Sequence, residues 1–300
     1  MRNRAVSVVL AAMLAALAFA LAPPLEGWGD EGHRYVSTVA VNSLPDEIPA
    51  FFRKAAARLI FLGPEPDRWR DNRQTYKALR EAGGPDHFID IDKPENFQAL
   101  PDDRYQYADW LRSVGKAPKD IGFLPYACLE TYEQVQVSFR LWREAGQAGE
   151  RSQIEQNIVH YAGVLGHYVA DGAQPLHTTV HYNGWTTSWN PEGYSREPLH
   201  WRFEGEYVQA KIKAEDFKQL VKTAQRLPDP FHSIMQYLLE SHGTIPELYR
   251  LDKQARWAKD NTNRDSKQFV VSRLAAAAQT LANLWYTAWL DSELPQRSRN

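Results

Sequence analysis

The chain has 300 residues, of which 43% are hydrophobic and 24% are charged, so it can bury a large core and is not an intrinsically disordered protein. Its formal net charge of −2 excludes the overall basic excess that is typical of nucleic-acid-binding proteins. Binding of a phosphate ester would therefore require a local positive site or bound cations.

The N-terminal segment has the features of a secretory signal peptide. Two arginines precede an apolar run over residues 5–22, and a short proline-containing stretch follows before Trp28. A single membrane anchor is the alternative, because the run is just long enough to span a bilayer, but no stop-transfer cluster of charges follows it. We expect a signal peptide over residues 1–27, a mature domain over residues 28–300, and a secreted or periplasmic protein.

The hydrophobic pattern of the remaining chain predicts an all-α protein. Strand patterns are nearly absent, and Cys128, the single cysteine, is expected to be an inert core residue that forms no intrachain disulfide. Long stretches that contain glycine and proline are predicted to be functional loops, over residues 83–104 and 178–198. Apolar residues at helical spacing predict helices over residues 124–145, 156–171, 231–240 and 266–290.

The stretch "GHYVADGAQPLH" lies at the end of the second predicted helix. His167 and Asp171 are four residues apart, so a helix places both on one face about one turn from each other, where they can bind the same ion. Pro175 is predicted to end the helix and turn the chain back before His177.

A second pair with the same spacing follows in "PLHWRFEGEY", where His200 and Glu204 are four residues apart. Imidazole and carboxylate groups on successive helical turns suit zinc. Taken alone, each pair also fits an ordinary hydrogen-bonded histidine in a helical protein. Two such pairs with His177 between them favour a metal centre.

Five motifs occur in a fixed order along the chain: "WGDEGH", "DRWR", "DHFID", "HYVADGAQPLH" and "LHWRFE". In this combination the sequence resembles the trinuclear-zinc, single-strand-specific nucleases known as type I nucleases, which share a superfamily with the bacterial zinc phospholipases C. The resemblance runs from Trp28 to about Tyr207, and residues 208–300 match only in their helical character. It implies a single multi-helix domain of the zinc phospholipase C/nuclease type.

The resemblance also implies nine residues that bind three zinc ions in one cleft. Three divalent cations would supply the local positive field that the net charge of the chain lacks. The implied ligands are Asp67, His87, His167 and Asp171 for the first zinc; the free amino group and carbonyl of Trp28, His33 and a bridging Asp171 for the second; and His177, His200 and Glu204 for the third.

Further residues receive roles in phosphodiester hydrolysis from the same resemblance. The two close zincs would activate a shared water that Asp67 orients, and the third would stabilise the departing oxygen. Arg70 would donate hydrogen bonds to the phosphoryl oxygens, with a surface ion pair as the alternative. Phe88 would stack on a nucleobase, and Asp90 would accept hydrogen bonds from the amino groups at the edge of that base. In the alternative, Phe88 lies in the core and Asp90 caps a helix.

The second zinc site depends on where the mature chain begins. Cleavage between Gly27 and Trp28 would free the amino group of Trp28, and the local sequence permits this cut. A cut after Ala20 would instead leave the Trp28 nitrogen in an amide bond. Because the spacing of His33 suits a ligand beside that amine, we expect Trp28 at the N-terminus.

Other residues leave the choice between nucleic acid and lipid open. The type I nucleases generally have aspartate where Glu204 stands and the phospholipases have glutamate, whereas the spacing of Trp28 and His33 follows the nucleases. The aromatic loop residues Trp185, Trp189 and Tyr194 fit a substrate platform or a rim that touches a membrane.

Three polar residues near the motifs have no zinc assigned to them. His160, seven residues before His167, is expected to be a core histidine or one that supports a ligand. His181 and Asn183 lie in "HYNGW", where the resembled family usually has a glycine-rich turn after the motif that contains His177. Neither residue has an assigned role.

We therefore predict an exported zinc-dependent phosphodiesterase with three zinc ions. The preferred function is a nuclease or 3'-nucleotidase that acts on single-stranded DNA or RNA, or on nucleotides, and yields 5'-phosphates. The alternatives are a zinc phospholipase C that acts on phospholipid and a non-catalytic zinc-binding protein. No protein partner is implied.

Overall fold

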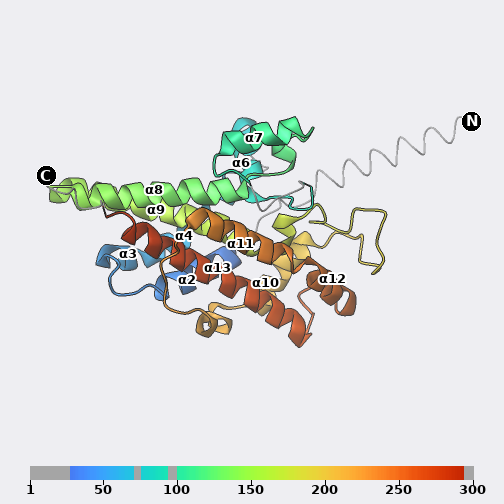
Figure 1. The fold of residues 1–300 in the computed structure, drawn as a ribbon. Coiled ribbons are helices and arrows are strands. Elements are labelled where there is room, and N and C mark those ends of the chain that lie inside the picture. Colours follow the sequence, from blue (N-terminus) through green and yellow to red (C-terminus); the bar gives the residue numbers. More distant parts are fainter. Residues whose placement is uncertain (1–27, 71–75, 94–99, 294–300) are drawn as a thin grey trace, which may run out of the picture.

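The computed structural model describes residues 28–70, 76–93 and 100–293. The predicted signal peptide, residues 1–27, lies outside this part of the chain. Among the described residues the only β-structure consists of two isolated bridges, and the rest is helix, turn or loop (Figure 1). The prediction of an all-α fold is confirmed. None of the described helices has both the length and the apolar character that crossing a bilayer requires.

The helices differ greatly in length, and short 3₁₀ or π-helical turns connect several of them. In chain order the described elements are α2 (Gly29–Asn42), α3 (Ala50–Lys54), α4 (Ala56–Leu62), α5 (Glu65–Arg68), α6 (Lys77–Gly83), η1 (Gly84–His87), α7 (Arg104–Ser113), η3 (Pro118–Asp120), α8 (Leu124–Glu144), α9 (Ala148–Ala173), η4 (Pro175–Thr178), the π-helical η5 (Arg202–Tyr207), α10 (Val208–Lys211), η6 (Ala214–Asp216), η7 (Lys218–Leu220), α11 (Pro230–His242), α12 (Ile245–Gln254) and α13 (Arg264–Leu290).

Helix α9 is the central element of the fold. It packs against α8 along much of its length and also contacts α2, α4, α11 and α13 (Figure 1). Every residue from Ala162 to Thr179 is buried, so the C-terminal half of α9 and the turn after it lie inside the molecule. The C-terminal half of α9 is apolar on most of its surface, and such a segment is stable only when other elements cover it, which explains its central position. Cys128 on α8 belongs to the same core.

A close approach between α9 and α4 brings the backbone after α4 to the centre of the molecule. A side-chain carbon at Gly163 would lie 2.3 Å from Cβ of Leu62, so only glycine permits this contact. Gly63, the residue after Leu62, lies beside His167, and the carbonyl of Gly63 faces the His167 ring.

Side-chain caps fix the starts of two long predicted helices. Asp229 accepts a hydrogen bond from the backbone of His232 at the start of α11, and Asn263 accepts from two backbone groups at the start of α13. Such caps satisfy N–H groups that have no partner within the helix. They therefore set where these helices begin.

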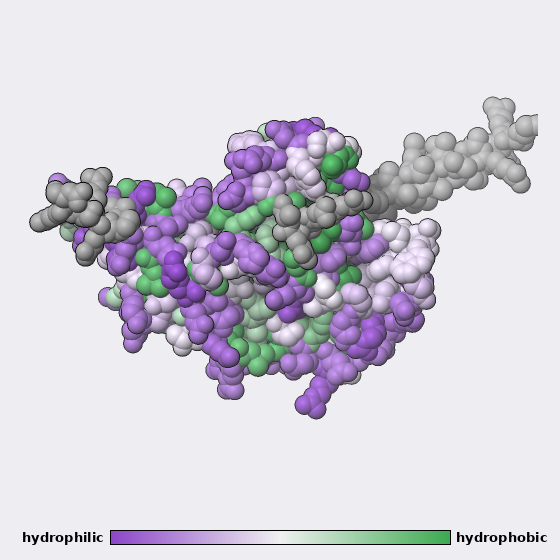
Figure 2. Space-filling view, viewed as in Figure 1, coloured by the Kyte–Doolittle hydropathy of each residue, from purple (hydrophilic) through white to green (hydrophobic). Residues whose placement is uncertain are grey.

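The region of α6, η1 and α7 stands beside one end of α8 and is tied to it by one arginine (Figure 1). Arg104 donates to Asp86 at 2.6 Å and to both carboxylate oxygens of Glu130 at 2.8 Å. Asp86 directly precedes His87, so this ion-pair network fixes the segment that carries one of the predicted ligands. In Figure 2 hydrophilic residues cover most of the visible face, and apolar residues show between this region and the helices below it.

Candidate metal centre

Eight of the nine predicted metal ligands meet in the interior through their side chains. They come from segments far apart in sequence, and all eight residues are buried. The distances between their ligand atoms divide these residues into three groups, each of which suits a metal ion. His167 belongs to two of the groups. The groups are His33, His167 and Asp171; Asp67, His87 and His167; and His177, His200 and Glu204.

The first predicted zinc site has four nitrogen and oxygen atoms that face one another. Asp171 Oδ2 lies 3.0 Å from His87 Nδ1 and 3.2 Å from His167 Nε2. Asp67 Oδ1 lies 3.6 Å and 3.7 Å from the same two nitrogens. The nitrogens themselves are 3.0 Å apart. These four atoms therefore form a small, closed polyhedron.

These separations fit tetrahedral zinc. A zinc ion about 2.0–2.1 Å from four ligand atoms requires those atoms to be roughly 3.3 Å apart. The five separations given above span 3.0–3.7 Å. In addition, Asp67 Oδ1 is a buried oxygen without a hydrogen-bond partner, as expected for a group that binds a cation. The residues at this position fit a metal ion.

Backbone carbonyls orient two of the histidines. His167 Nδ1 lies 2.9 Å from the carbonyl of Gly63, and His177 Nδ1 lies 2.7 Å from the carbonyl of His87. Because a carbonyl only accepts, each Nδ1 must carry the proton, and Nε2 keeps a free lone pair. Each Nε2 is the atom that faces the neighbouring predicted ligands, an arrangement common among metal-binding histidines.

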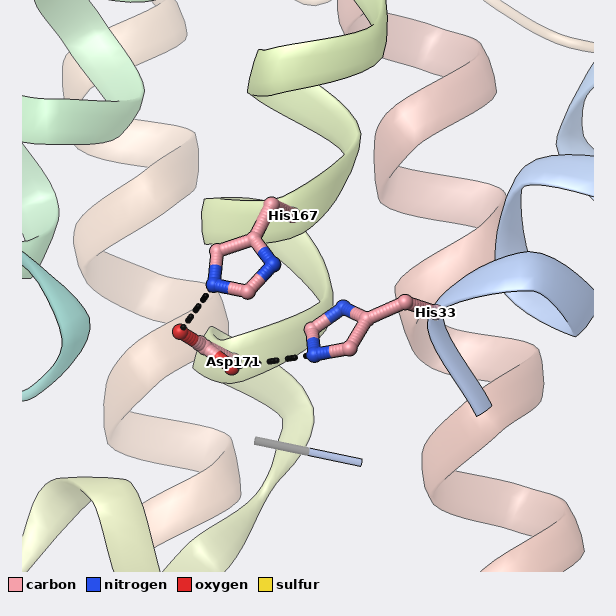
Figure 3. A group of neighbouring side chains, drawn as sticks. All are labelled: His33, His167 and Asp171. Atoms are coloured by element: carbon pink, nitrogen blue, oxygen red, sulfur yellow. Dashed lines mark ion pairs between the residues drawn. The ribbon is translucent and has the colours of Figure 1, made fainter. Parts of the chain in front are cut away.

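The second predicted site lies on the other side of the Asp171 carboxylate. Asp171 Oδ1 is 3.6 Å from His33 Nε2, and the His33 ring stacks on His167 with centroids 4.2 Å apart (Figure 3). Asp67 Oδ2 is 3.9 Å from the same nitrogen. Both ring nitrogens of His33 and Oδ1 of Asp171 are buried without hydrogen-bond partners. These atoms fit a second cation that shares Asp171 with the first.

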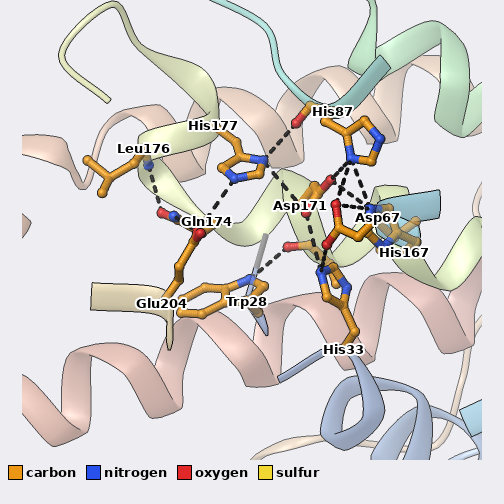
Figure 4. A network of polar contacts seen from close by, with 12 residues as sticks. Trp28, His33, Asp67, His87, His167, Asp171, Gln174, Leu176, His177 and Glu204 are labelled. Carbon is orange, nitrogen blue, oxygen red and sulfur yellow. Dashed lines mark hydrogen bonds and ion pairs between the residues drawn. The ribbon is translucent and has the colours of Figure 1, made fainter. Parts of the chain in front are cut away.

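Trp28 lies next to these ligands, and its side chain is fully buried. The indole N–H donates to the carbonyl of Ala170 at 2.8 Å, one residue before Asp171 (Figure 4). Gly29 adopts a φ of +60°, a conformation that favours glycine and that turns the chain from Trp28 into α2. The tryptophan is thus anchored beside the second site. The described residues begin with it, so its predicted role as a terminal amine remains a prediction.

The third predicted site joins a turn after α9 to the start of η5. His200 Nε2 lies 2.7 Å from Glu204 Oε2 and 3.2 Å from His177 Nε2, and the latter two groups are 3.6 Å apart. The side-chain amide of Gln174 donates a hydrogen bond to Glu204 Oε2 at 2.7 Å, and the side-chain oxygen Oε1 of Gln174 accepts one from the backbone N–H of Leu176 (Figure 4). Gln174 therefore holds the Glu204 carboxylate toward the two histidines.

Burial and mutual charge set the protonation of the metal-free centre. Burial lowers the pKa of His33 and His87 well below the usual value, and that of His200 to about 3. These imidazoles are neutral, which is the form that binds metals. Burial opposes ionisation of Asp171, but His167 and His177 outweigh it, so its pKa lies well below the usual value.

Two carboxyl groups of the centre show the opposite shift. Burial raises the pKa of Asp67 to about 6 and that of Glu204 to about 8. At neutral pH and without metal, Glu204 therefore holds a proton that an incoming cation must displace. The third site is the one where pH and metal binding are most closely linked.

A cleft of about 850 Å³ opens onto the centre and has the size of a substrate site. Its lining combines predicted metal ligands with the residues predicted to contact substrate. The residues concerned are His87, His177, His200, Arg70, Phe88 and Asp90.

A family model described as S1/P1 Nuclease matches residues 28–292. The chain belongs to the S1/P1 nuclease family. The predicted resemblance to the type I nucleases is confirmed. The three buried groups are consistent with the metal dependence of this family.

Two similar solved structures are the alpha-toxin of Clostridium absonum and the alpha-toxin of an avian strain of Clostridium perfringens. They share 16% and 17% sequence identity with this S1/P1 family member, with TM-scores of 0.43 and 0.44. The matches cover 89% and 87% of this chain but 65% and 64% of the toxin chains, so the chain spans just under two thirds of their length. No curated protein matches the chain.

Arg70 and the predicted base pocket lie on the cleft of the S1/P1 family member. Arg70 Nη1 is 3.5 Å from Asp67 Oδ1, and only 16% of the arginine side chain is exposed, so this is an ion pair inside the site and not on the open surface. Phe88 is partly exposed on the lining and is not part of the buried core. Asp90 pairs with Lys93 at 2.7 Å and caps no described helix.

The expectation for His160 was wrong. The residue is exposed and contributes neither to the core nor to the centre. Seven residues of helix span about 10.5 Å, which carries His160 on α9 beyond the level of the metal ligands. The sequence spacing placed it on the correct face but could not show where the covering helices end.

The three aromatic residues of the 178–198 loop do not act as one surface. Trp185 stacks on His181 with centroids 3.8 Å apart, and it also packs against Tyr194 and Tyr249. Trp189 alone is strongly exposed, at 74%. The side chains of Trp185 and Tyr194 thus have a packing role in the loop, and His181 supports it.

Two residues that hold the third site were not recognised from sequence as such. Gln174 stands between predicted ligands in "HYVADGAQPLH", but the contact of its side-chain amide with Glu204 depends on a segment 30 residues away. Asn183 had no assigned role, yet its side-chain oxygen accepts from the backbone of Leu199 and His200 at 3.0 Å and 3.2 Å. It fixes the start of the helical segment that carries His200.

Proposed function

We propose that this chain is an exported zinc-dependent phosphodiesterase with three zinc ions, which hydrolyses single-stranded DNA or RNA and nucleoside 3'-phosphates. Water adds to phosphorus and the bond to the 3'-oxygen breaks, which leaves a 5'-phosphate on the product of nucleic-acid cleavage. The observation that carries this proposal is that three buried ligand groups occur in an S1/P1 family member, and that residues of two of these groups line one cleft. Export rests on the predicted signal peptide over residues 1–27.

The chain's own residues have separate tasks in this reaction. Bound zinc would supply Lewis acidity and positive charge for hydrolysis of the ester. Asp67 would orient the attacking water through its carboxylate, which lies between His33 and His87. Arg70, 3.5 Å from Asp67, would donate to the phosphoryl oxygens as negative charge develops on them.

The cleft also supports recognition of a nucleobase. Phe88 offers a partly exposed ring on the lining, and aromatic rings of this kind stack on bases of any sequence. Asp90 lies two residues further on, where Lys93 holds one of its oxygens at 2.7 Å. The carboxylate is thereby oriented to accept hydrogen bonds from the amino groups of a stacked base.

A phospholipase C is the second candidate. It is favoured by Glu204, because the phospholipases have glutamate at this ligand position, and by the exposed Trp189 at the loop tip, which suits contact with a lipid surface. The base-binding character of Phe88 and Asp90 favours the nuclease.

A paired assay tests these functions. Zinc-loaded protein is incubated with single-stranded DNA, single-stranded RNA and phosphatidylcholine vesicles, and Asp171→Asn protein serves as the control for activity of this centre. The proposal expects nucleic-acid cleavage with 5'-phosphate ends and no headgroup release. Headgroup release alone would identify the phospholipase, and no hydrolysis of any substrate would leave a zinc-binding protein.

A further inference from the structure

Tyr182 is an exposed aromatic residue on the cleft that the functions above do not use. Its side chain is 42% exposed and lies on the same lining as Phe88. The ring lies 6.0 Å from the ring of His200, centroid to centroid, with an angle of 70° between the planes. An apolar ring is therefore presented to the cleft directly beside the third ligand group.

The backbone on both sides of Tyr182 is held in place. The next residue, Asn183, accepts hydrogen bonds from the backbone of Leu199 and His200. The preceding residue, His181, accepts at its carbonyl from the hydroxyl of Tyr249. The backbone that carries the ring is thus held in place relative to His200, which reduces the entropy lost when the ring binds a ligand.

Two further residues of the lining extend its apolar surface. Pro198 is exposed, and Trp201 is half-buried on the same lining. Trp201 lies flat over Gly205, where a side-chain carbon would be only 2.4 Å from the indole ring. The tryptophan can approach the backbone this closely only because position 205 is glycine, so Trp201 is a closely packed part of the same cleft lining.

The third ligand group connects the positions of Phe88 and Tyr182. Phe88 follows His87, whose carbonyl binds His177 Nδ1 at 2.7 Å. His177 Nε2 lies 3.2 Å from His200 Nε2, and His200 contacts the Tyr182 ring. A nucleic-acid strand bound with a phosphate at His177 and His200 would therefore have one aromatic ring, Phe88 or Tyr182, near each of these two histidines.

We infer that Tyr182 is a second base-stacking position, so that the cleft binds the bases of two nucleotides on either side of the scissile phosphate. The inference rests on the proposed function and names its substrate unit as a dinucleotide step. The cleft volume of about 850 Å³ is near the upper end of the range for small-ligand sites, as two nucleotides require. Stacking needs only a π-face, so this position would accept any base.

The test compares a dinucleotide with two analogues, each of which lacks one of the two bases. Tyr182→Ala should raise KM for the dinucleotide roughly 5- to 150-fold, the range that one stacked base represents. The same change should have a much smaller effect on the analogue that lacks the base at Tyr182. Phe88→Ala should show the reverse preference between the analogues. Tyr182→Phe should retain the KM of the unaltered protein.

Tyr105→Ala is the matched control, because Tyr105 is 78% exposed on α7 and does not line the cleft. An equal rise of KM for all three substrates in Tyr182→Ala would indicate a structural role and overturn the inference. An unchanged KM for the dinucleotide would also overturn it. If the unaltered protein hydrolyses no dinucleotide, the proposed function itself fails, which separates the two outcomes.

Discussion

Oδ1 of Asp171 lies 3.6 Å from Nε2 of His33. The other oxygen of the same carboxylate lies 3.0 Å from His87 and 3.2 Å from His167. One side chain therefore faces two groups of ligand atoms, and its charge stabilises cations in both. Asp171→Asn keeps the shape but removes this charge, so it should lower hydrolysis by several orders of magnitude and reduce the bound zinc of both close sites. Elemental analysis and cleavage of single-stranded DNA measure the two effects.

The control for this prediction is His160→Gln, on the same helix. His160 is exposed and distant from the centre, so this variant should keep its zinc and its activity. Equal losses in the two variants would show that Asp171 does not act as a shared ligand.

Removal of the Gln174 amide should weaken the third site selectively. Gln174 donates to Glu204 at 2.7 Å and is completely buried, so Gln174→Leu leaves the carboxylate without its orienting partner. Loss of such a supporting hydrogen bond typically costs about 10- to 100-fold in metal affinity. Titration with a competing chelator should show one weakened zinc and two unchanged ones.

Gln236→Leu provides the comparison, because Gln236 is exposed on α11. If Gln174→Leu and Gln236→Leu bind all zinc ions as tightly as the unaltered protein, then Glu204 is held in place by other contacts.

Stability of the metal-free protein should fall as the pH rises from about 7.5 to about 8.5, through the raised pKa of Glu204. Burial raises the pKa of Glu204 to about 8 from its usual 4.5, so the folded chain holds a proton that the unfolded chain has released. The pKa of His167 is also raised, because Asp171 and Asp67 outweigh its burial. Stability rises with pH only where the unfolded chain binds more protons, and here it binds fewer. Over the same range zinc affinity should increase, since zinc displaces these protons.

Urea unfolding of chelated protein at several pH values measures this effect. The histidines with lowered pKa still take up protons in the unfolded chain near pH 6.5, which opposes the effect of Glu204, and this opposing contribution has largely ended by about pH 7.5. Glu204→Gln should flatten the dependence. A stability that rises with pH between about 7.5 and about 8.5 would contradict the assigned direction.

The N-terminus of the exported protein should be Trp28. Its buried indole is anchored to Ala170, next to the shared ligand Asp171, so a free amine at this residue is well placed to bind the second zinc. A chain that begins with methionine before Trp28 should lose one zinc and most activity unless the methionine is removed. Terminal sequencing of the exported protein decides the cleavage site, and a dominant start at Leu21 would refute the amine ligand.

The periodic pattern predicted α8, α9, α11 and α13 because each has a continuous buried face, but it did not predict α2, which spans 14 residues. The prediction for 124–145 differs from α8 by one residue at its end. Helix α9 begins at Ala148, well before the predicted 156, because its first turns are polar and exposed and carry no apolar period. The short helices α3, α5 and α10 span at most five residues each, too few for a periodic signal.

The centre was predictable only where both ligands lie on one helical segment. Spacing of four residues paired His167 with Asp171 and His200 with Glu204, and the structure places both pairs within 3.2 Å. Spacing could not bring Asp67 or His87 to α9, so these ligands came from the family resemblance alone. The carbonyl of Gly63 contacts His167, and the amide of Gln174 contacts Glu204. Both contacts join segments far apart in sequence, and no local sequence motif predicts them.

The zinc content of the exported, mature protein tests the central claim most directly. The geometry of the three ligand groups predicts close to three zinc ions per chain. Elemental analysis of folded protein that has not been exposed to a chelator measures this content. One zinc ion or none in such a sample would contradict the trinuclear centre.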